Sequence, residues 1–281
     1  MATPIGNLAD ITLRALHVLQ LADAIACEDT RHTQTLLHAY GIDKAPDQLI
    51  AAHQHNEAQA AQKIIERLAH GERIAYVSDA GTPGISDPGA RLAAAVHAAG
   101  MRCMPLPGAS SVTCALSVAG VVAGAPEAGG FVFAGFLPAK GSERVAAMQR
   151  LGNEPRCVVL LEAPHRIAAL ASDLKALGPR HVTFARELTK QFEEITTCRA
   201  DALEPWLAAS AQRSRGEFVV VLHPLPDAPV RHDEGLRILQ LLLQALPLKT
   251  AVRVAADITQ EPKNALYQQA LALRENRSSD R

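Results

Sequence analysis

Three short segments carry residue types from which a small-molecule site can be built. EDTRHT (28–33) brings together two carboxylates, an arginine and a histidine, whereas DAGTPGISDPG (79–89) and PGASS (107–111) are rich in glycine and other small residues. Carboxylates and histidine can accept a proton from a substrate. Glycine lets the backbone approach a ligand closely, and a helix start offers free N–H donors. The three segments therefore predict a ligand site that the backbone can approach closely and that has a polar rim.

Each of these segments follows an apolar run that predicts a buried strand, at 23–27, 73–78 and 101–106. Amphipathic helical patterns alternate with these runs, and another strand is predicted at 48–52. This order favours a mostly parallel sheet covered on both faces. Glycine and proline are also ordinary turn residues. However, ligands of open parallel sheets bind beyond the carboxyl ends of the strands, and three unusual loops at that edge favour a ligand cleft.

The alternation resumes after a Gly- and Ala-rich connection at 120–130. Strands are predicted at 131–135, 157–161, 181–185 and 218–222, and helices near 142–151, 164–177 and 201–212. Three prolines at 224–229 hold the chain extended, and only helical patterns follow, at 233–245, 248–257 and 263–274. We expect an α/β fold with mostly parallel or mixed sheets. Its parts are two α/β domains, residues 1–118 and 119–223, and a proline linker with a small all-helical C-terminal domain, residues 224–281.

Composition excludes several classes of protein. The chain has 281 residues, 48% apolar and 4% aromatic, with a formal net charge of −1. This length suits about two domains with buried cores. Balanced charge excludes a histone-like polycation but allows an RNA partner bound through a local basic face. No apolar run is long enough to cross a membrane and no secretory signal is visible at the start, so we expect a cytoplasmic protein.

The cysteines and the absence of common motifs narrow the chemistry further. The five cysteines are spread along the chain without a C-x-x-C pair, which favours reduced thiols and argues against a disulfide framework or a metal site. The chain has no G-x-G-x-x-G, P-loop or G-x-S-x-G motif, which argues against a standard dinucleotide site, a P-loop and an α/β-hydrolase. The residues alone predict a two-domain α/β enzyme that binds a nucleoside-like ligand.

A family resemblance takes the prediction further. Its blocks are TPIGNLADIT (3–12), EDTRHT (28–33), SDAGTPGISDPG (78–89), PLPGASS (105–111), FAGFLP (133–138), LEAPHR (161–166), ARELTK (185–190) and GEFVVV (216–221). In this order, over nearly the whole chain, they resemble the tetrapyrrole methylase superfamily of S-adenosylmethionine-dependent methyltransferases. Within it they are similar to the bacterial branch that 2′-O-methylates a cytidine of 16S ribosomal RNA. Residues 246–271 resemble the small C-terminal helical domain of that branch.

The resemblance implies a cofactor and its site. It implies two α/β domains with S-adenosylmethionine in the cleft between them, usually in a homodimer. The positions that match the cofactor-binding residues of the family are Pro4, Asp79, Ala80, Gly81, Thr82, Ile85, Ser110, Ser111 and Ala163. Family members also have a short apolar strand before the first loop, where this sequence has Met1-Ala2. We therefore expect an uncovered sheet position there and a less firmly held loop at 3–8.

The implied reaction transfers a methyl group from a sulfonium to a ribose 2′-hydroxyl of 16S ribosomal RNA in the small subunit. Because that hydroxyl must lose its proton, a carboxylate or histidine within hydrogen-bond reach would help. The candidates are Glu28, Asp29, His32 and Asp79, and the sequence does not choose among them. Asp87 is the weakest candidate because capping of the following helix already explains it.

Cations in the family blocks and in the tail suit contacts with RNA phosphates. These are Arg31, Arg166 and Lys190 in the α/β part and Lys249 and Lys263 in the tail. Structural salt bridges are the alternative for the first three, and a mixed-charge solvated helix is the alternative for the last two. Two other functions stay open. One is methylation of a tetrapyrrole precursor, against which EDTRHT and the tail argue; the other is a non-catalytic RNA-binding role in ribosome assembly, against which the intact SDAGTPGISDPG argues.

Overall fold

The computed structural model describes residues 1–53, 55–87, 89–121, 130–225, 232–259 and 262–279. The chain divides into two compact units, Met1–Pro224 and Leu225–Arg281. The first unit holds two separate sheets, one built from residues 24–77 and the other from residues 131–222. Most of the predicted connection at 120–130 and of the proline linker at 224–229 lies outside the described residues. The predicted boundary at 118/119 stays a prediction.

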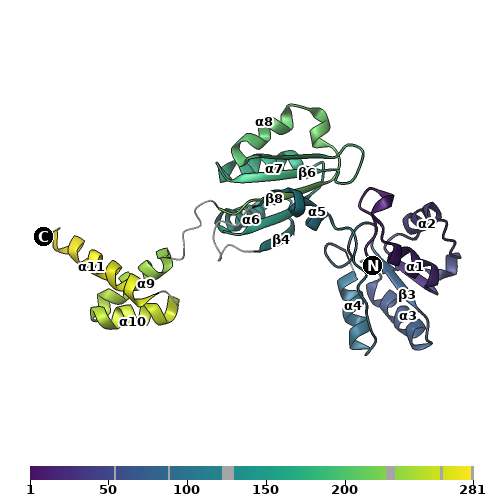
Figure 1. Cartoon of the computed structure of the whole chain (residues 1–281), viewed down its shortest axis with the longest axis horizontal. Coiled ribbons are helices and arrows are strands. Elements are labelled where there is room, and N and C mark those ends of the chain that lie inside the picture. The colour runs from purple at the N-terminus through teal and green to yellow at the C-terminus, as the bar shows by residue number, and fades with distance from the viewer. Residues whose placement is uncertain (54, 88, 122–129, 226–231, 260–261, 280–281) are drawn as a thin grey trace. The chain divides into compact units, whose positions relative to one another are not determined.

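The first sheet is parallel throughout. Its strands β1 (Ala24–Cys27), β2 (Leu49–Ala51) and β3 (Ile74–Val77) lie in the order β2-β1-β3. Two helices pack on each face (Figure 1). One face carries α1 (Leu13–Leu21) and α2 (Thr30–Ala39), and the opposite face carries α3 (Glu57–Ala69) and α4 (Gly89–Ala98). This arrangement follows the predicted alternation of strands and helices, with each strand buried between helices.

The predicted strand at 101–106 is wrong, because no strand is formed there. A strand needs a neighbouring backbone to complete its ladder. Among the described residues, the backbone that lies between β3 and residues 101–106 is that of Met1 and Ala2. The Ala2 N–H donates to the Leu106 carbonyl (3.3 Å), and the Met1 ammonium donates to the Tyr76 carbonyl of β3 (2.7 Å). An apolar cavity of about 430 Å³ is lined by β3, α4 and residues 102–106. The position beside β3 is therefore only partly filled by described residues.

The second sheet is mixed. Its strands are β4 (Phe131–Phe136), β5 (Cys157–Glu162), β6 (His181–Arg186), β7 (Glu194–Arg199) and β8 (Phe218–Leu222), in the order β4-β5-β8-β6-β7. Only β4 and β5 pair in parallel, and the other three pairings are antiparallel. β7 and the helix α5 (Ser111–Val118) were not expected from the sequence. Short 3-10 helices lie at Leu8–Asp10, Pro46–Gln48, Lys175–Leu177, Ala200–Ala202 and Ala211–Ser214.

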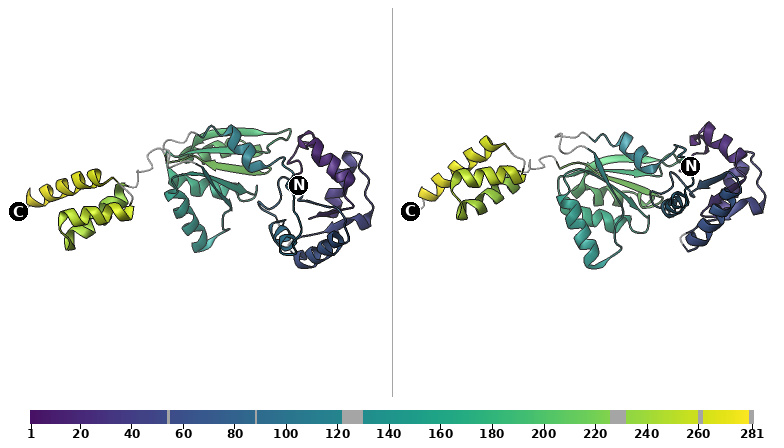
Figure 2. Two further views of the ribbon diagram at one scale, coloured as in Figure 1. Left: turned by 60° about the horizontal axis from the view of Figure 1, so that its bottom comes forward. Right: turned by 90° about the horizontal axis from the view of Figure 1, so that it is seen from below.

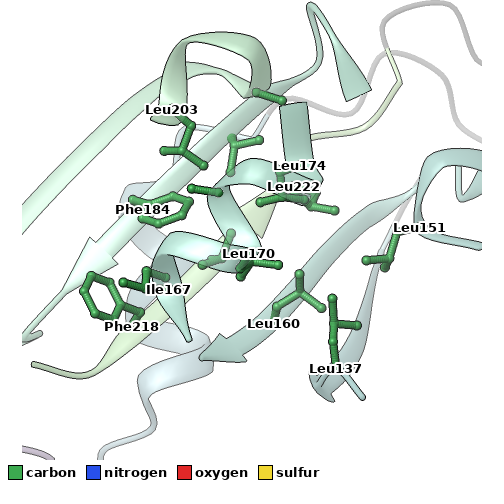
Figure 3. Close-up of a cluster of buried hydrophobic side chains, with 14 of the residues drawn as sticks. Leu137, Leu151, Leu160, Ile167, Leu170, Leu174, Phe184, Leu203, Phe218 and Leu222 are labelled. Atoms are coloured by element: carbon green, nitrogen blue, oxygen red, sulfur yellow. The ribbon is translucent and has the colours of Figure 1, made fainter. Parts of the chain in front are cut away.

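The main core of the first unit lies on one face of this second sheet. The helices α6 (Gly141–Asn153), α7 (Ile167–Leu174) and α8 (Leu203–Ala208) cover that face, whereas α5 covers the other (Figure 2). In Figure 3, Leu160, Phe184 and Phe218 of the strands surround Ile167 and Leu170 of α7. Each of these side chains is almost fully buried, which contributes roughly 1.5–3 kcal/mol per large apolar side chain. This core holds the strand ends that line the site described below.

The second unit consists of α9 (His232–Ala245), α10 (Leu248–Thr259) and α11 (Lys263–Ser279). Small residues of α10, Ala251 and Ala255, are fully buried and pack with Leu239 of α9 and Leu266 of α11. Small side chains at such contacts let helices approach closely. The predicted helical patterns in the tail match these helices. Within the described residues, no helix combines the length and apolar character that a membrane span requires.

The cavity beside β3 gives a stability prediction. Burial lowers the pKa of the Met1 ammonium, so an amide N–H in its place would keep the bond to Tyr76 without a desolvated charge. We expect four apolar β-branched residues joined before Met1 to enter the cavity and raise Tm by several degrees, since each buried apolar side chain contributes roughly 1.5–3 kcal/mol. Calorimetric melting of the extended chain, against one extended by Gly and Ser, tests this. Equal Tm values for the two would contradict it.

Candidate active site

Three predicted loops are tied together by hydrogen bonds to backbone groups. Thr3 and Gly81 form an isolated antiparallel bridge, with N–H to carbonyl distances of 3.0 and 3.1 Å in the two directions. The Thr82 hydroxyl donates to the carbonyl of Ala109 (2.9 Å), and the Thr3 hydroxyl donates to the carbonyl of Ser78 (3.3 Å). The loop at 3–8, the loop after β3 and the loop before α5 are therefore one connected structure. The expectation of a loosely held first loop does not apply at Thr3.

Gly81 is required at the centre of this structure for two reasons. Its φ of +81° is in a region that side chains other than glycine rarely adopt. A Cβ at this position would also lie 3.2 Å from Cγ2 of Ile5. Ile5 lines the cavity described next, so a larger residue at 81 would press on the cavity wall. The glycine in the predicted ligand loop thus has both a backbone role and a packing role.

A cavity of about 450 Å³ opens beside these loops, within the range of small-molecule sites. Its lining includes seven of the nine predicted cofactor-binding residues: Ala80, Gly81, Thr82, Ile85, Ser110, Ser111 and Ala163. Phe136, Leu161 and Phe218 from the second sheet provide apolar walls. Both sheets of the first unit therefore contribute to one cavity, as ligand sites of α/β proteins commonly do.

Some residues that line this cavity were not predicted from the sequence. Pro4 is buried but does not line the cavity, whereas its neighbour Ile5 does. Leu188 and Glu217 also line it, from segments within the blocks ARELTK and GEFVVV. The blocks pointed to these segments, but no pattern within them indicates which side chain faces a ligand.

Glu28 and Asp79 meet because β1 and β3 are paired, with Cys27 opposite Val77. The Asp79 N–H donates to Oε2 of Glu28 (3.1 Å), and the Asp29 N–H donates to Oδ1 of Asp79 (3.2 Å). Burial raises the pKa of the Glu28 carboxyl; the hydrogen bond from Asp79 opposes this rise, and the charges of Asp79 and Asp87 add to it. Glu28 is therefore held in place and is a stronger base than an ordinary surface glutamate.

The other predicted proton acceptors have different surroundings. Asp29 caps α2, accepting from the N–H groups of Arg31 (2.8 Å) and His32 (3.4 Å). Hydrogen bonds from Arg31 hold the pKa of Asp29 well below its usual range, which makes it a weak base. His32 is exposed and lines neither cavity of this site. Asp87 accepts from the N–H groups of Gly84 and Gly89 (2.9 Å each), which agrees with its expected role at the start of α4.

A second, more open cavity of about 660 Å³ adjoins the first. Its lining residues are Glu28, Asp29, His53, Glu57, Asp79, Ser86, Asp87, Ala90 and Arg91. Glu28, Ser86 and Asp87 line both cavities. Of the predicted proton acceptors, Glu28 and Asp87 lie on this shared wall, and Asp87 is already engaged by the N–H groups of Gly84 and Gly89. Glu28 is therefore the candidate placed between a ligand in one cavity and a second molecule in the other.

The predicted RNA-binding cations fall into two groups. Arg166 and Lys190 are engaged within the protein: Arg166 pairs with Glu162 (3.1 Å), and Lys190 pairs with Glu187 (2.9 Å) and Glu217 (3.1 Å). This favours the structural salt bridges that the sequence left open for these two. Arg31 also forms an ion pair, with Asp29 (2.8 Å), but its side chain is 90% exposed. In the tail, Lys249 is exposed, and Lys263 is 4.0 Å from Asp257 with both side chains 63% exposed. Among the described residues, no His, Cys, Asp and Glu side chains cluster as metal ligands would.

Comparison with known proteins places this site in a family. The model of the tetrapyrrole (corrin/porphyrin) methylases matches residues 2–204, and that of the RsmI C-terminal HTH domain matches residues 230–274. The chain belongs to the tetrapyrrole methylase family. A ribosomal RNA small subunit methyltransferase I of Neisseria meningitidis serogroup B is 47% identical over 278 residues, covering 97% of this chain and 92% of that protein. The protein of the same name from Escherichia coli O157:H7 is 45% identical over 273 residues, covering 96% of this chain and 92% of that protein.

A solved structure of the family shows the same fold. It is uroporphyrin-III C-methyl transferase from Thermus thermophilus complexed with S-adenyl homocysteine, with a TM-score of 0.51 and 16% identity. The match covers 79% of this chain and 95% of that one. The expected α/β fold of the tetrapyrrole methylases, with a further C-terminal helical region, is thus confirmed.

Gly81→Val tests the position of the ligand. The side chain would push Ile5 toward the cavity, and we expect the affinity for S-adenosylhomocysteine, measured by calorimetry, to fall roughly tenfold or more, as overpacking costs suggest. Gly100→Val is the matched control. Gly100 has a similar φ of +74°, but a Cβ there would meet no atom within 4 Å, so this variant carries the backbone strain without the contact. Equal losses of affinity in both folded variants would contradict the assignment.

Proposed function

We propose that the chain is an S-adenosylmethionine-dependent methyltransferase that methylates 16S ribosomal RNA of the small subunit at the 2′-hydroxyl of a cytidine, in the cytoplasm. Relatives over almost the whole chain carry the name ribosomal RNA small subunit methyltransferase I. Membership of the tetrapyrrole methylases supports the cofactor and the type of reaction. The observation on which the mechanism rests most is the position of Glu28 on the wall shared by two adjoining cavities.

The residues that line the first cavity fit a nucleoside cofactor with a positive sulfonium. Phe136, Leu161 and Phe218 offer apolar surface for an adenine ring. In the loop of Asp79, Ala80, Gly81 and Thr82 the small residues let the backbone approach the ligand closely, and the loop is held by the pairing of Gly81 with Thr3 and by its proximity to Ile5, which follows the buried Pro4. Carboxylates at the rim, Glu28 and Asp79, complement a positive charge. Ile85, Ser110, Ser111 and Ala163 complete the proposed site.

When bound, the cofactor supplies a methyl group already activated by the sulfonium charge. The protein must then hold the acceptor oxygen in line with that methyl group and accept a proton. Glu28 is the proposed acceptor of this proton. A raised pKa strengthens it as a base, and its bond from the Asp79 N–H fixes its orientation. Asp79 positions Glu28, and Asp29 holds the start of α2, where Arg31 and His32 follow.

RNA docking is proposed to use exposed cations. Arg31 next to the second cavity and Lys249 and Lys263 in the tail are exposed, so they suit phosphate contacts. Arg166 and Lys190 are less suited, because they are paired within the protein and their side chains are only 23% and 29% exposed, whereas the pair of Arg31 with Asp29 leaves Arg31 exposed. From the family resemblance we also propose that the chain acts as a homodimer.

Glu28→Gln tests the proton acceptor. The amide keeps the shape but cannot take the proton, so we expect the rate of methyl transfer to fall roughly 10²–10⁴-fold while cofactor affinity stays similar. In the unchanged enzyme the rate should fall as the pH falls through the raised pKa of Glu28, because the protonated carboxyl is inactive; the variant should lose this limb. The measurement is single-turnover transfer of a labelled methyl group to small ribosomal subunits. A larger loss in Asp29→Asn would assign the role to Asp29 instead.

The same assay separates the proposed substrate from its rivals. Label should enter small ribosomal subunits and not a tetrapyrrole precursor. Transfer to the tetrapyrrole alone would replace the proposed substrate. Failure to bind S-adenosylmethionine, measured by calorimetry, would favour a non-catalytic RNA-binding protein.

Removal of residues 226–281 tests the tail. The cavity residues all lie in the first unit, so cofactor binding should survive, whereas methylation of the RNA should fall sharply. Lys249→Gln and Lys263→Gln should each weaken RNA binding and reduce the slope of log affinity against log salt by about one. Exposed Lys63 in α3 supplies the control Lys63→Gln, which should leave the slope unchanged. Loss of cofactor binding together with the tail would instead indicate a structural role.

A further inference from the structure

One buried carboxylate at the wall of the first cavity lacks part of its hydrogen bonding. Glu162 is the last residue of β5, and its side chain is 0% exposed. Its Oε1 accepts from the Ala163 N–H (2.9 Å) and pairs with Nε of Arg166 (3.1 Å). Its Oε2 is buried and has no hydrogen-bond partner among the described residues. A buried oxygen of this kind is costly and rare, so it calls for an explanation.

The position of Glu162 separates it from other buried oxygens without a partner. Within the described part of the chain, the buried side-chain oxygens without a hydrogen-bond partner are on Glu162, Thr189 and Gln269. Only Glu162 lines the proposed cofactor cavity, beside Ala163 and Pro164. The missing partner of Glu162 is therefore expected among molecules that enter this cavity.

The chemistry of the pair selects the type of donor. An ionised carboxylate only accepts hydrogen bonds, so the partner must be an N–H or O–H group. Because Arg166 already neutralises Glu162, an uncharged donor satisfies Oε2 without placing another full charge in a buried position. Acidic residues beyond strand ends of α/β sheets bind ribose hydroxyls in this way.

We propose that Oε2 of Glu162 accepts a hydrogen bond from a ribose hydroxyl of the bound cofactor, which makes Glu162 a binding residue. This inference rests on the proposed S-adenosylmethionine site. Arg166 then acts as a positioning residue: it pairs with Glu162 and also donates to the carbonyls of Leu137 and Pro138 after β4. The pair would thus link the ribose to the strand end that carries Phe136.

The test measures how the loss of a hydroxyl and the loss of the carboxylate combine. Calorimetry of the full-length protein gives the affinities for S-adenosylhomocysteine and for its 2′-deoxy and 3′-deoxy analogues. In the unchanged protein one deoxy analogue should bind on the order of tenfold or more weakly, as for a hydrogen bond to a charged group. In Glu162→Gln that penalty should largely disappear. The amide NH2 group would stand where Oε2 was, and it cannot accept a hydrogen bond from a hydroxyl.

Asp173→Asn is the matched control. Asp173 pairs with the largely buried Arg144 at 2.6 Å and does not line the cavity, so this variant loses a comparable ion pair elsewhere in the same unit. It should keep the full penalty for the deoxy analogue. If Glu162→Gln fails to fold, the double variant Glu162→Met with Arg166→Met removes both charges at once and should show the same loss of discrimination.

Two results would overturn the inference while leaving the proposed function intact. One is an unchanged deoxy penalty in the folded Glu162 variants. The other concerns an analogue of S-adenosylhomocysteine that lacks the α-amino group. If this analogue binds more weakly than S-adenosylhomocysteine to the unchanged protein but not to Glu162→Gln, Oε2 would be assigned to the α-amino group. If the unchanged protein fails to bind S-adenosylhomocysteine at all, the proposed function fails, and this inference fails with it.

Discussion

The parallel pairing of β1 with β3 is the constraint on which the site depends. Because Cys27 lies opposite Val77, the residues that follow the two strands emerge side by side at one edge of the sheet. Two carboxylates that are 51 positions apart in sequence are thereby brought within one hydrogen-bond network, through the Asp79 N–H and Oε2 of Glu28. A shift of one residue in this register would turn the side chains to the opposite face. The proton acceptor is thus placed by strand pairing and its strength is set by burial.

The neighbouring loops have no regular structure of their own, so they need other contacts. The bridge between Thr3 and Gly81 and the bond from Thr82 to Ala109 supply them. The bridge joins backbone to backbone, and the Thr82 hydroxyl bonds a backbone carbonyl, so the loops pack closely. Small residues and glycine permit this packing, because a side chain at Gly81 or Gly108 would meet Ile5 or Ala2. The composition of these loops therefore reflects both the approach of a ligand and the close packing of the loops on one another.

The sequence predicted the elements that have strong local signals. The strands β1 and β3 follow from apolar runs. The wrong strand at 101–106 also has an apolar pattern, but a strand depends on a partner that a local pattern does not reveal. β7 was missed because it alternates between partly buried and exposed residues at the edge of its sheet. Likewise, nothing local distinguishes Glu28 from Asp29, since their difference arises from the contact with Asp79 and the pairing with Arg31.

The second cavity is lined mostly by carboxylates, so an enzyme that binds RNA there needs cations on other parts of its surface. Glu28, Asp29, Glu57, Asp79 and Asp87 line that cavity, and Arg91 pairs with Glu57 (2.9 Å). Such a lining favours a positive cofactor and a strong base, but it repels RNA phosphates. The attraction that brings a polyanion to the site must therefore come from other surfaces, and screening by salt limits that attraction to charges within about 10 Å of a phosphate. Lys249 and Lys263 of the helical unit are exposed cations of the kind that this attraction requires.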